Sequence, residues 1–229
     1  MTPKVKQQLL VWAEKYNDPV WFQEDPIAFP REFLTRGACL QDVEIAAVFA
    51  ALFAWGRREM IVRDCERLFD HMEWKPFEYV QAGDYRDDAT SIHRTTRWSD
   101  VAGVCRRLHE WYSWHDSLEC LTPSEMRVTV YGQKDDPKAA NKKINMMRRW
   151  MVRDDGKVDL GLWKHTDKRE LIIPLDVHVY DQAKALRLTK RRSKDITTAL
   201  QITDELRKVF PDDPLLGDFA LFGSGLDNK

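Results

Sequence analysis

Apolar residues recur along most of the chain at the spacing of α-helices rather than of strands. Residues 57–72 put their apolar side chains on one face, and residues 101–115 form a second such stripe. Residues 43–55 are apolar all round, which predicts a central helix. We expect further helices over residues 3–16, 76–81, 137–153, 177–188 and 213–222. The pattern therefore predicts an all-α protein.

The remaining segments are expected to be connections or loops. Residues 17–30 are interrupted by prolines, and residues 83–97 are polar. Only residues 127–131 alternate as a strand would. The composition, 229 residues with 43% hydrophobic and 32% charged, suits one compact unit of residues 1–229 with a substantial core.

Charge and cysteine content limit the classes of protein. The net charge of −1 argues against binding nucleic acid through overall charge, so any such binding would depend on local clusters of basic residues. The four cysteines form no Cys-x-x-Cys pair, and His109 and His115 form no His-Glu-x-x-His motif, so we expect no metal site. No stretch looks like a signal peptide or a membrane span. We expect a cytoplasmic protein with reduced thiols.

The segment Ile173 to Tyr180 (IPLDVHVY) places one carboxylate at the start of a helix. Pro174 cannot continue a helix, and Asp176 is a favoured N-cap whose side chain accepts a hydrogen bond from a backbone N–H group. The carboxylate is thereby held in place. An ordinary capped helix is the alternative interpretation.

The predicted helix 137–153 is basic on one side. Asp136 is its expected cap and Pro137 its first residue. One face is apolar, and no acidic residue occurs between Lys138 and Arg153. The opposite face would carry Lys142, Asn145, Arg149 and Arg153. Such a stripe faces water or a polyanion, and the lack of acidic residues favours phosphate.

A second basic cluster follows the Asp176 helix. Its members are Lys184, Arg187, Lys190, Arg191, Arg192 and Lys194. We expect this cluster and the basic helix, which includes Lys143, to flank the Asp176 carboxylate and contact nucleic acid, with Lys190, Arg191 and Arg192 as the main contacts of the second cluster.

The Pro-Leu-Asp-Val-His-Val segment resembles the Pro-Val-Asp-Thr/Val-His segment of the helix-hairpin-helix (HhH-GPD) DNA glycosylases. Residues 141–153, 158–163 and 212–226 resemble an uncharacterised bacterial family that is a distant branch of the same superfamily. In pattern the chain is nearest to the archaeal 8-oxoguanine glycosylases. The resemblance implies a two-lobed helical bundle with a cleft between the lobes. The lobes would be residues 31–135, and residues 136–229 together with 1–30.

The resemblance also implies roles for single residues. Asp176 would be the catalytic carboxylate, and Lys142, 34 positions earlier, resembles the displaced nucleophilic lysine of the archaeal enzymes. Lys157, 19 positions before Asp176, is the alternative, because the usual hairpin signature is missing. Asp218 and Phe222, one helical turn apart, would line a base pocket.

The implied activity is excision of a damaged base, perhaps an oxidised purine, from double-stranded DNA by a monomer, with or without lyase action. The lack of Cys-x-x-Cys pairs excludes the four-cysteine iron–sulfur loop of some glycosylases, and no cofactor is expected. Two other classes stay open. One is a non-catalytic nucleic-acid-binding module on the same scaffold, and the other is a helical interaction protein.

Overall fold

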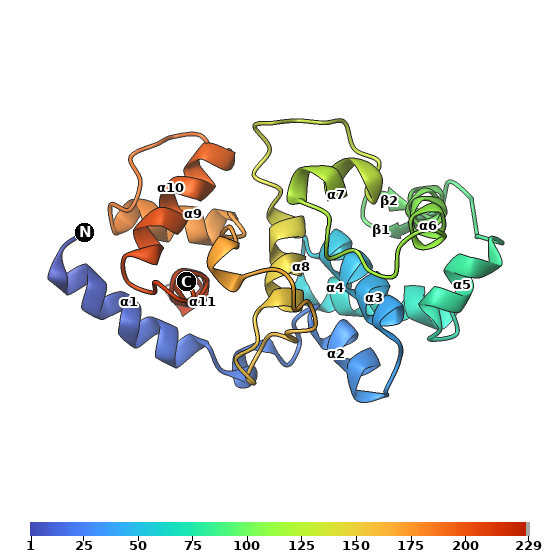
Figure 1. Cartoon of the computed structure of the whole chain (residues 1–229), viewed down its shortest axis with the longest axis horizontal. Helices are drawn as coiled ribbons and strands as arrows, with labels where there is room; N and C mark the ends of the chain where they lie inside the picture. Colours follow the sequence, from blue (N-terminus) through green and yellow to red (C-terminus); the bar gives the residue numbers. More distant parts are fainter. Residues whose placement is uncertain (228–229) are drawn as a thin grey trace. The chain divides into compact units, whose positions relative to one another are not determined.

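The computed structural model describes residues 1–227 and is mostly helical (Figure 1). Within that part of the chain, the only sheet is an antiparallel pair of short strands, β1 (Ser91–His93) and β2 (Thr96–Arg97). The α-helices are α1 (Pro3–Tyr16), α2 (Ala28–Thr35), α3 (Leu40–Phe53), α4 (Arg58–His71), α5 (Pro76–Ala82), α6 (Trp98–Tyr112), α7 (Pro123–Thr129), α8 (Lys142–Val152), α9 (Val177–Ala185), α10 (Ile196–Arg207) and α11 (Leu216–Asp227).

The chain divides into two compact units. Unit 1 contains Met1–Phe22 and Asp136–Lys229, and unit 2 contains Gln23–Asp135. Two short 3-10 helices, η1 (Pro19–Phe22) and η2 (Lys168–Glu170), complete the elements. In the described residues no helix is both long enough and apolar enough to cross a membrane.

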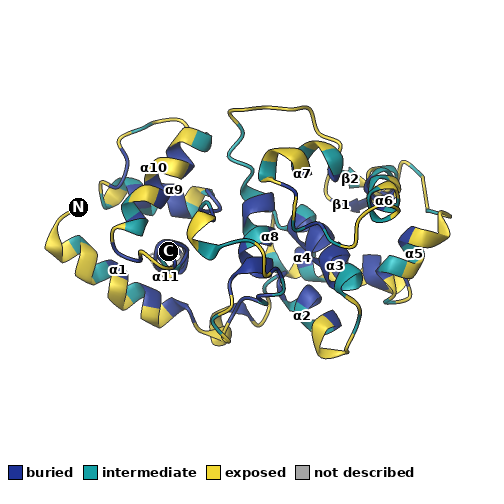
Figure 2. Cartoon of the chain, viewed as in Figure 1, coloured by how far each residue is buried: buried dark blue, intermediate teal, exposed yellow. Residues whose placement is uncertain are grey.

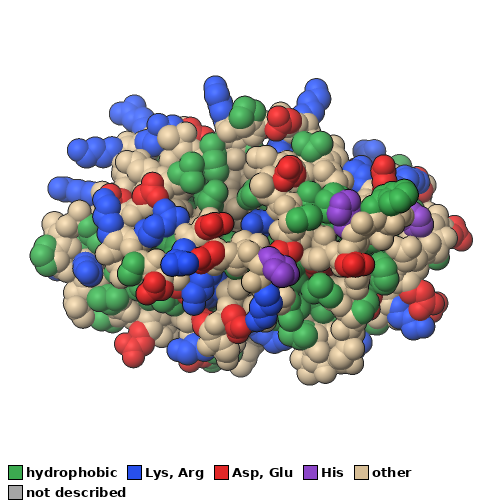
Figure 3. All heavy atoms as spheres, viewed as in Figure 1, with side chains coloured by type: hydrophobic (Ala, Val, Ile, Leu, Met, Phe, Trp, Pro, Cys, Tyr) green, Lys and Arg blue, Asp and Glu red, His purple; other side chains and the backbone are tan. Residues whose placement is uncertain are grey.

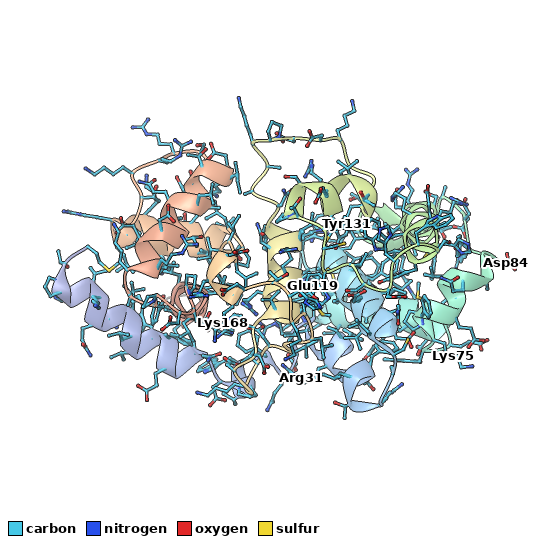
Figure 4. All side chains as sticks on the ribbon, viewed as in Figure 1. Arg31, Lys75, Asp84, Glu119, Tyr131 and Lys168 are labelled. Carbon is cyan, nitrogen blue, oxygen red and sulfur yellow. The ribbon has the colours of Figure 1, made fainter. Side chains whose placement is uncertain are left out.

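Helix α3 is the centre of unit 2, as its all-round apolar pattern predicts. It contacts α2, α4 and α5, and most of its residues are buried (Figure 2). Its buried Glu44 accepts hydrogen bonds from the Tyr112 hydroxyl (2.8 Å), the Ser117 hydroxyl (2.6 Å) and the Leu118 N–H. The Tyr131 hydroxyl, labelled in Figure 4, donates to the Val48 carbonyl. Polar groups at the core are thus hydrogen-bonded, as burial demands.

Unit 1 is built around α11, which packs against α1 and α9. The predicted end of this helix at Gly223 is wrong, because α11 continues through Gly223 and Gly225 to Asp227. A Cβ on Gly223 would lie 2.2 Å from Cγ of Tyr16. Gly223 therefore allows α1 and α11 to approach closely rather than ending the helix.

The basic helix begins later than its sequence signals predict. Residues 137–141 are not helical, and α8 starts at Lys142, preceded by Asn141 in the left-handed region (φ 46°). The Lys138 carbonyl accepts a hydrogen bond from the Ile196 N–H (3.0 Å), which ties the preceding segment to the start of α10. This tertiary contact outweighs the Asp136-Pro137 start signal.

Three other local predictions are wrong. In place of the strand expected at residues 127–131, residues 127–129 form the end of α7 and residues 130–131 follow it. This helix begins at Pro123 with a capping box between Thr122 and Glu125. The loop expected at residues 83–97 contains the β1–β2 hairpin. Helix α2 begins at Ala28, inside the segment 17–30 that was expected to be a connection.

Candidate active site

Asp176 is the N-cap of α9, as predicted. Its Oδ1 accepts a hydrogen bond from the Val179 N–H (2.8 Å), and its backbone is extended. Pro174 and Leu175 before it are buried, while its own side chain stays 13% exposed. The cap fixes one carboxylate oxygen and leaves Oδ2 for another partner.

That partner is Lys142. Its Nζ lies 3.9 Å from Asp176 Oδ2, and its side chain is 35% exposed. Lys142 is the first residue of α8, so the pair joins the N-terminal ends of two helices within unit 1. Lys157 is exposed beside Gly156 in a turn and forms no ion pair with the described residues. Of the two candidate lysines, Lys142 is the one that forms an ion pair with Asp176.

The neighbouring Lys143 has an unusual environment that the sequence analysis did not identify. Burial lowers the pKa of its ammonium group to about 8, and the positive charge of Lys142 acts in the same direction. The sequence shows the neighbouring charge of Lys142, but the larger cause, burial, is not visible there. At pH 7, about one Lys143 side chain in ten is therefore neutral.

Arg149 and Arg153 do not face water, so the predicted phosphate-binding stripe is wrong for both. Arg149 is 5% exposed and Arg153 is fully buried. Arg149 donates to Asp218 (2.7 Å) and Asp159 (3.2 Å). Both guanidinium groups lie over the ring of Phe219, at 4.4 and 4.7 Å.

Arg153 completes this buried ionic network. It pairs with Asp155, Asp159 and Asp213, and Asn17 also donates to Asp155 (2.8 Å). Burial alone lowers the pKa of Arg153, but the carboxylates outweigh it and the net shift is upward. Both arginines thus hold together α8, the segment after it and α11.

The prediction that Asn145 lies on the exposed basic face is also wrong. It is 2% exposed, and its side chain donates to the Ala140 carbonyl (2.9 Å). This bond braces the irregular turn before α8, so Asn145 is a structural residue rather than an exposed phosphate contact.

The two predicted base-pocket residues differ in environment. Asp218 is 3% exposed and paired with Arg149. Burial raises its pKa to about 6 against the effect of Arg149, and the charge of Asp176 adds to the rise. Phe222 is half-buried, with its ring 6.1 Å from the His178 ring on α9. Asp218 is therefore a buried carboxyl group affected by the charge of Asp176, while Phe222 lies beside His178 of α9.

The second basic cluster does lie at the surface of unit 1. Lys190 and Arg192 are exposed, whereas Arg191 pairs with Asp195 (2.8 Å) and also donates to Thr198. Lys and Arg side chains project from the α9–α10 side of this unit in Figure 3. The bond from Ile196 to Lys138 brings the approach to α8 next to this loop.

Together these residues define a mostly helical protein that holds a lysine–carboxylate pair where two helices begin. The described residues contain no group of three or more His, Cys, Asp or Glu side chains that could hold a metal ion. The chain belongs to the family described as protein of unknown function (DUF2400), whose profile matches residues 25–136 and 124–227. Searches of curated proteins and of solved structures found no match.

Proposed function

We propose that this protein is a DNA glycosylase of the helix-hairpin-helix class that excises a damaged base, such as an oxidised purine, and has lyase activity. The observation that carries the proposal is the 3.9 Å approach of Lys142 Nζ to Asp176 Oδ2. A glycosylase with lyase activity needs an amine and a carboxylate at one sugar, and this pair supplies both while remaining partly exposed.

The proposed chemistry begins with transfer of a proton from Lys142 to Asp176. The neutral amine attacks C1′ of the damaged nucleotide, the bond from C1′ to the base breaks, and the base leaves with a proton. Opening of the sugar ring then leaves a Schiff base between C1′ and Lys142 Nζ. Asp176 passes the proton it accepted to the departing base, and the regenerated carboxylate then moves a proton from the new C1′ amine to the ring oxygen as the ring opens.

The surroundings hold side chains that suit the other requirements of base excision. An enzyme that acts on a base within duplex DNA must extrude it, at a cost of a few kcal/mol, and hold it outside the stack. Phe222 offers an aromatic surface near the start of α9, and the exposed Lys190 and Arg192 offer charges for phosphates. Both features belong to the same unit as Asp176.

The decisive experiment measures base release and strand nicking on a panel of modified-base duplexes. We expect release by the wild type and at least about 100-fold less by Asp176→Asn, a typical loss for removing an acid–base group. Asparagine caps helices as well as aspartate, so this variant keeps the cap and loses the charge. Asp176→Ala should lose activity and also about 1 kcal/mol of stability.

Equal base release by wild type and Asp176→Asn would overturn the proposal. The alternative is a nucleic-acid-binding module without chemistry, which the lack of the usual hairpin signature before Asp176 favours. That alternative predicts salt-sensitive DNA binding that survives Asp176→Asn, with no base release by the wild type on any duplex.

A further inference from the structure

A separate group of cationic side chains lies in unit 2, at the turn between α3 and α4. Arg57 and Arg58 open α4, and Arg94 reaches the same turn from the β1–β2 hairpin. Arg57 and Arg94 are exposed and Arg58 is partly exposed. We call Arg57, Arg58 and Arg94 the turn cluster.

Arg94 is held against this turn by packing. Its guanidinium carbon lies 4.1 Å from the centre of the Trp55 ring. Gly56 has a positive φ of 112°, and a Cβ on it would lie 2.7 Å from Arg94 Nη1. The glycine thus lets the guanidinium lie flat against the turn, and stacking on an aromatic face leaves its N–H edge available to a ligand.

Hydrogen bonds in the interior of unit 2 fix the backbone that carries the turn cluster. His93, fully buried, hydrogen-bonds the Asp64 carboxylate through Nδ1 (2.8 Å) and the Trp55 carbonyl through Nε2 (3.0 Å). Asp64 is also bonded to Arg63. The turn that carries the cluster is therefore tied to the core on both sides, which preorganises the three arginines.

The turn cluster differs from five other arginines of this unit. Five of them form ion pairs with carboxylates: Arg36, Arg63, Arg67, Arg86 and Arg106. Within the described residues, none of the turn cluster forms an ion pair. Moreover, positive charge at a helix N-terminus is unfavourable by about 0.3–1 kcal/mol, yet Arg57 and Arg58 occupy that end of α4. One acidic residue, Glu59, lies in the first turn of α4, and the two arginines outnumber it, which favours an external anion.

We propose that the turn cluster binds consecutive phosphates of a nucleic acid backbone, as a contact in unit 2 additional to the Lys142–Asp176 site. Guanidinium groups match phosphate oxygens in a bidentate manner, and three of them on a rigid turn suit a repeating polyanion better than a single ion. The identity of the nucleic acid as duplex DNA rests on the proposed function.

The test measures binding of a fluorescent, undamaged duplex of about 20 base pairs over a range of salt concentrations. We expect the slope of log K against log salt to be shallower by about 2 in Arg57→Gln/Arg94→Gln than in the wild type, because each lost phosphate contact reduces it by about 1. Arg36→Gln is the matched control. Arg36 also stacks on a tryptophan of unit 2, Trp74 at 4.4 Å, but it is already paired with Glu32. The slope of log K against log salt should therefore be the same for Arg36→Gln as for the wild type.

A further variant separates charge from packing. Arg94→Lys keeps the charge and loses the planar stack, so it should retain the wild-type slope. The single variant Arg94→Gln removes the charge and serves for comparison. If Arg94→Lys melts like the wild type but has the same slope as Arg94→Gln, the phosphate contact is overturned. The proposal is also overturned if the double variant keeps the wild-type slope, if the wild type binds no duplex at about 50 mM salt, or if it binds phosphatidylglycerol vesicles instead.

The same experiment separates this proposal from the proposed function. Undamaged DNA requires no chemistry, so a reduced slope in Arg57→Gln/Arg94→Gln supports the turn cluster even if the wild type releases no base. Conversely, an unchanged slope with normal base release would leave the glycosylase proposal standing and remove the turn cluster from it.

Discussion

At the scale of the residue, Asp176 uses its two carboxylate oxygens for different tasks. Oδ1 caps α9 and Oδ2 faces Lys142. The cap is a local property of the Pro-Leu-Asp sequence, so the sequence alone predicts it. The approach of Lys142 depends on how α8 and α9 pack, and only the resemblance to glycosylases pointed to that residue. Lys143 stayed unrecognised as a buried amine because burial is not visible in the sequence.

Asp218 makes a residue-scale prediction about pH. Burial raises its pKa from 3.8 to about 6 in the folded protein, so the folded state binds its proton more tightly than the unfolded state. Its contribution to stability is therefore full below pH 3.8 and is lost as pH rises through about 6. Asp218→Asn does not titrate, and the stability of this variant relative to the wild type should rise over that interval.

Urea unfolding of both proteins at several pH values checks this prediction. A difference in the free energy of unfolding that stays constant between about pH 4 and pH 7 would show that Asp218 is as accessible to water in the folded as in the unfolded chain.

At the scale of the element, close helix packing explains the wrong end predicted for α11. Glycine usually marks a helix C-terminus, but Gly223 lies inside α11 where Tyr16 of α1 leaves no space for a side chain. The start of α8 was mispredicted for a similar reason. Local start signals at Asp136 and Pro137 lose to a hydrogen bond from α10, a partner about 60 residues away in sequence.

Gly223→Ala should therefore destabilise unit 1 by about 1–3 kcal/mol, the usual cost of overpacking. Gly103→Ala is the matched control, because Gly103 also lies inside a helix, α6, but its added Cβ meets only the end of the Arg107 side chain at 3.6 Å. The control should gain about 0.5–1 kcal/mol from helix propensity.

Chemical denaturation followed by circular dichroism distinguishes the two substitutions. Equal effects of Gly223→Ala and Gly103→Ala would mean that α1 and α11 do not approach as closely as described.

At the scale of the whole molecule, charge is distributed differently from what the sequence indicates. The arginines of the basic helix were expected at the surface, yet Arg149 and Arg153 neutralise aspartates as far as 69 positions away. The absence of acidic residues on α8 itself could not reveal those partners. With a net charge of −1, binding to DNA would depend on the exposed basic side chains that remain, at the α9–α10 loop and the turn cluster.

The central claim is that Lys142 attacks the sugar with the help of Asp176. Sodium borohydride reduces a Schiff base to a stable amine, so it should trap the wild type covalently on a duplex that carries the damaged base. Peptide mapping should place the adduct on Lys142. Lys142→Gln should abolish trapping, whereas Lys143→Gln, which removes the neighbouring amine, should retain it.

An adduct on Lys143 in the wild-type protein, or trapping that survives in Lys142→Gln, would contradict the account.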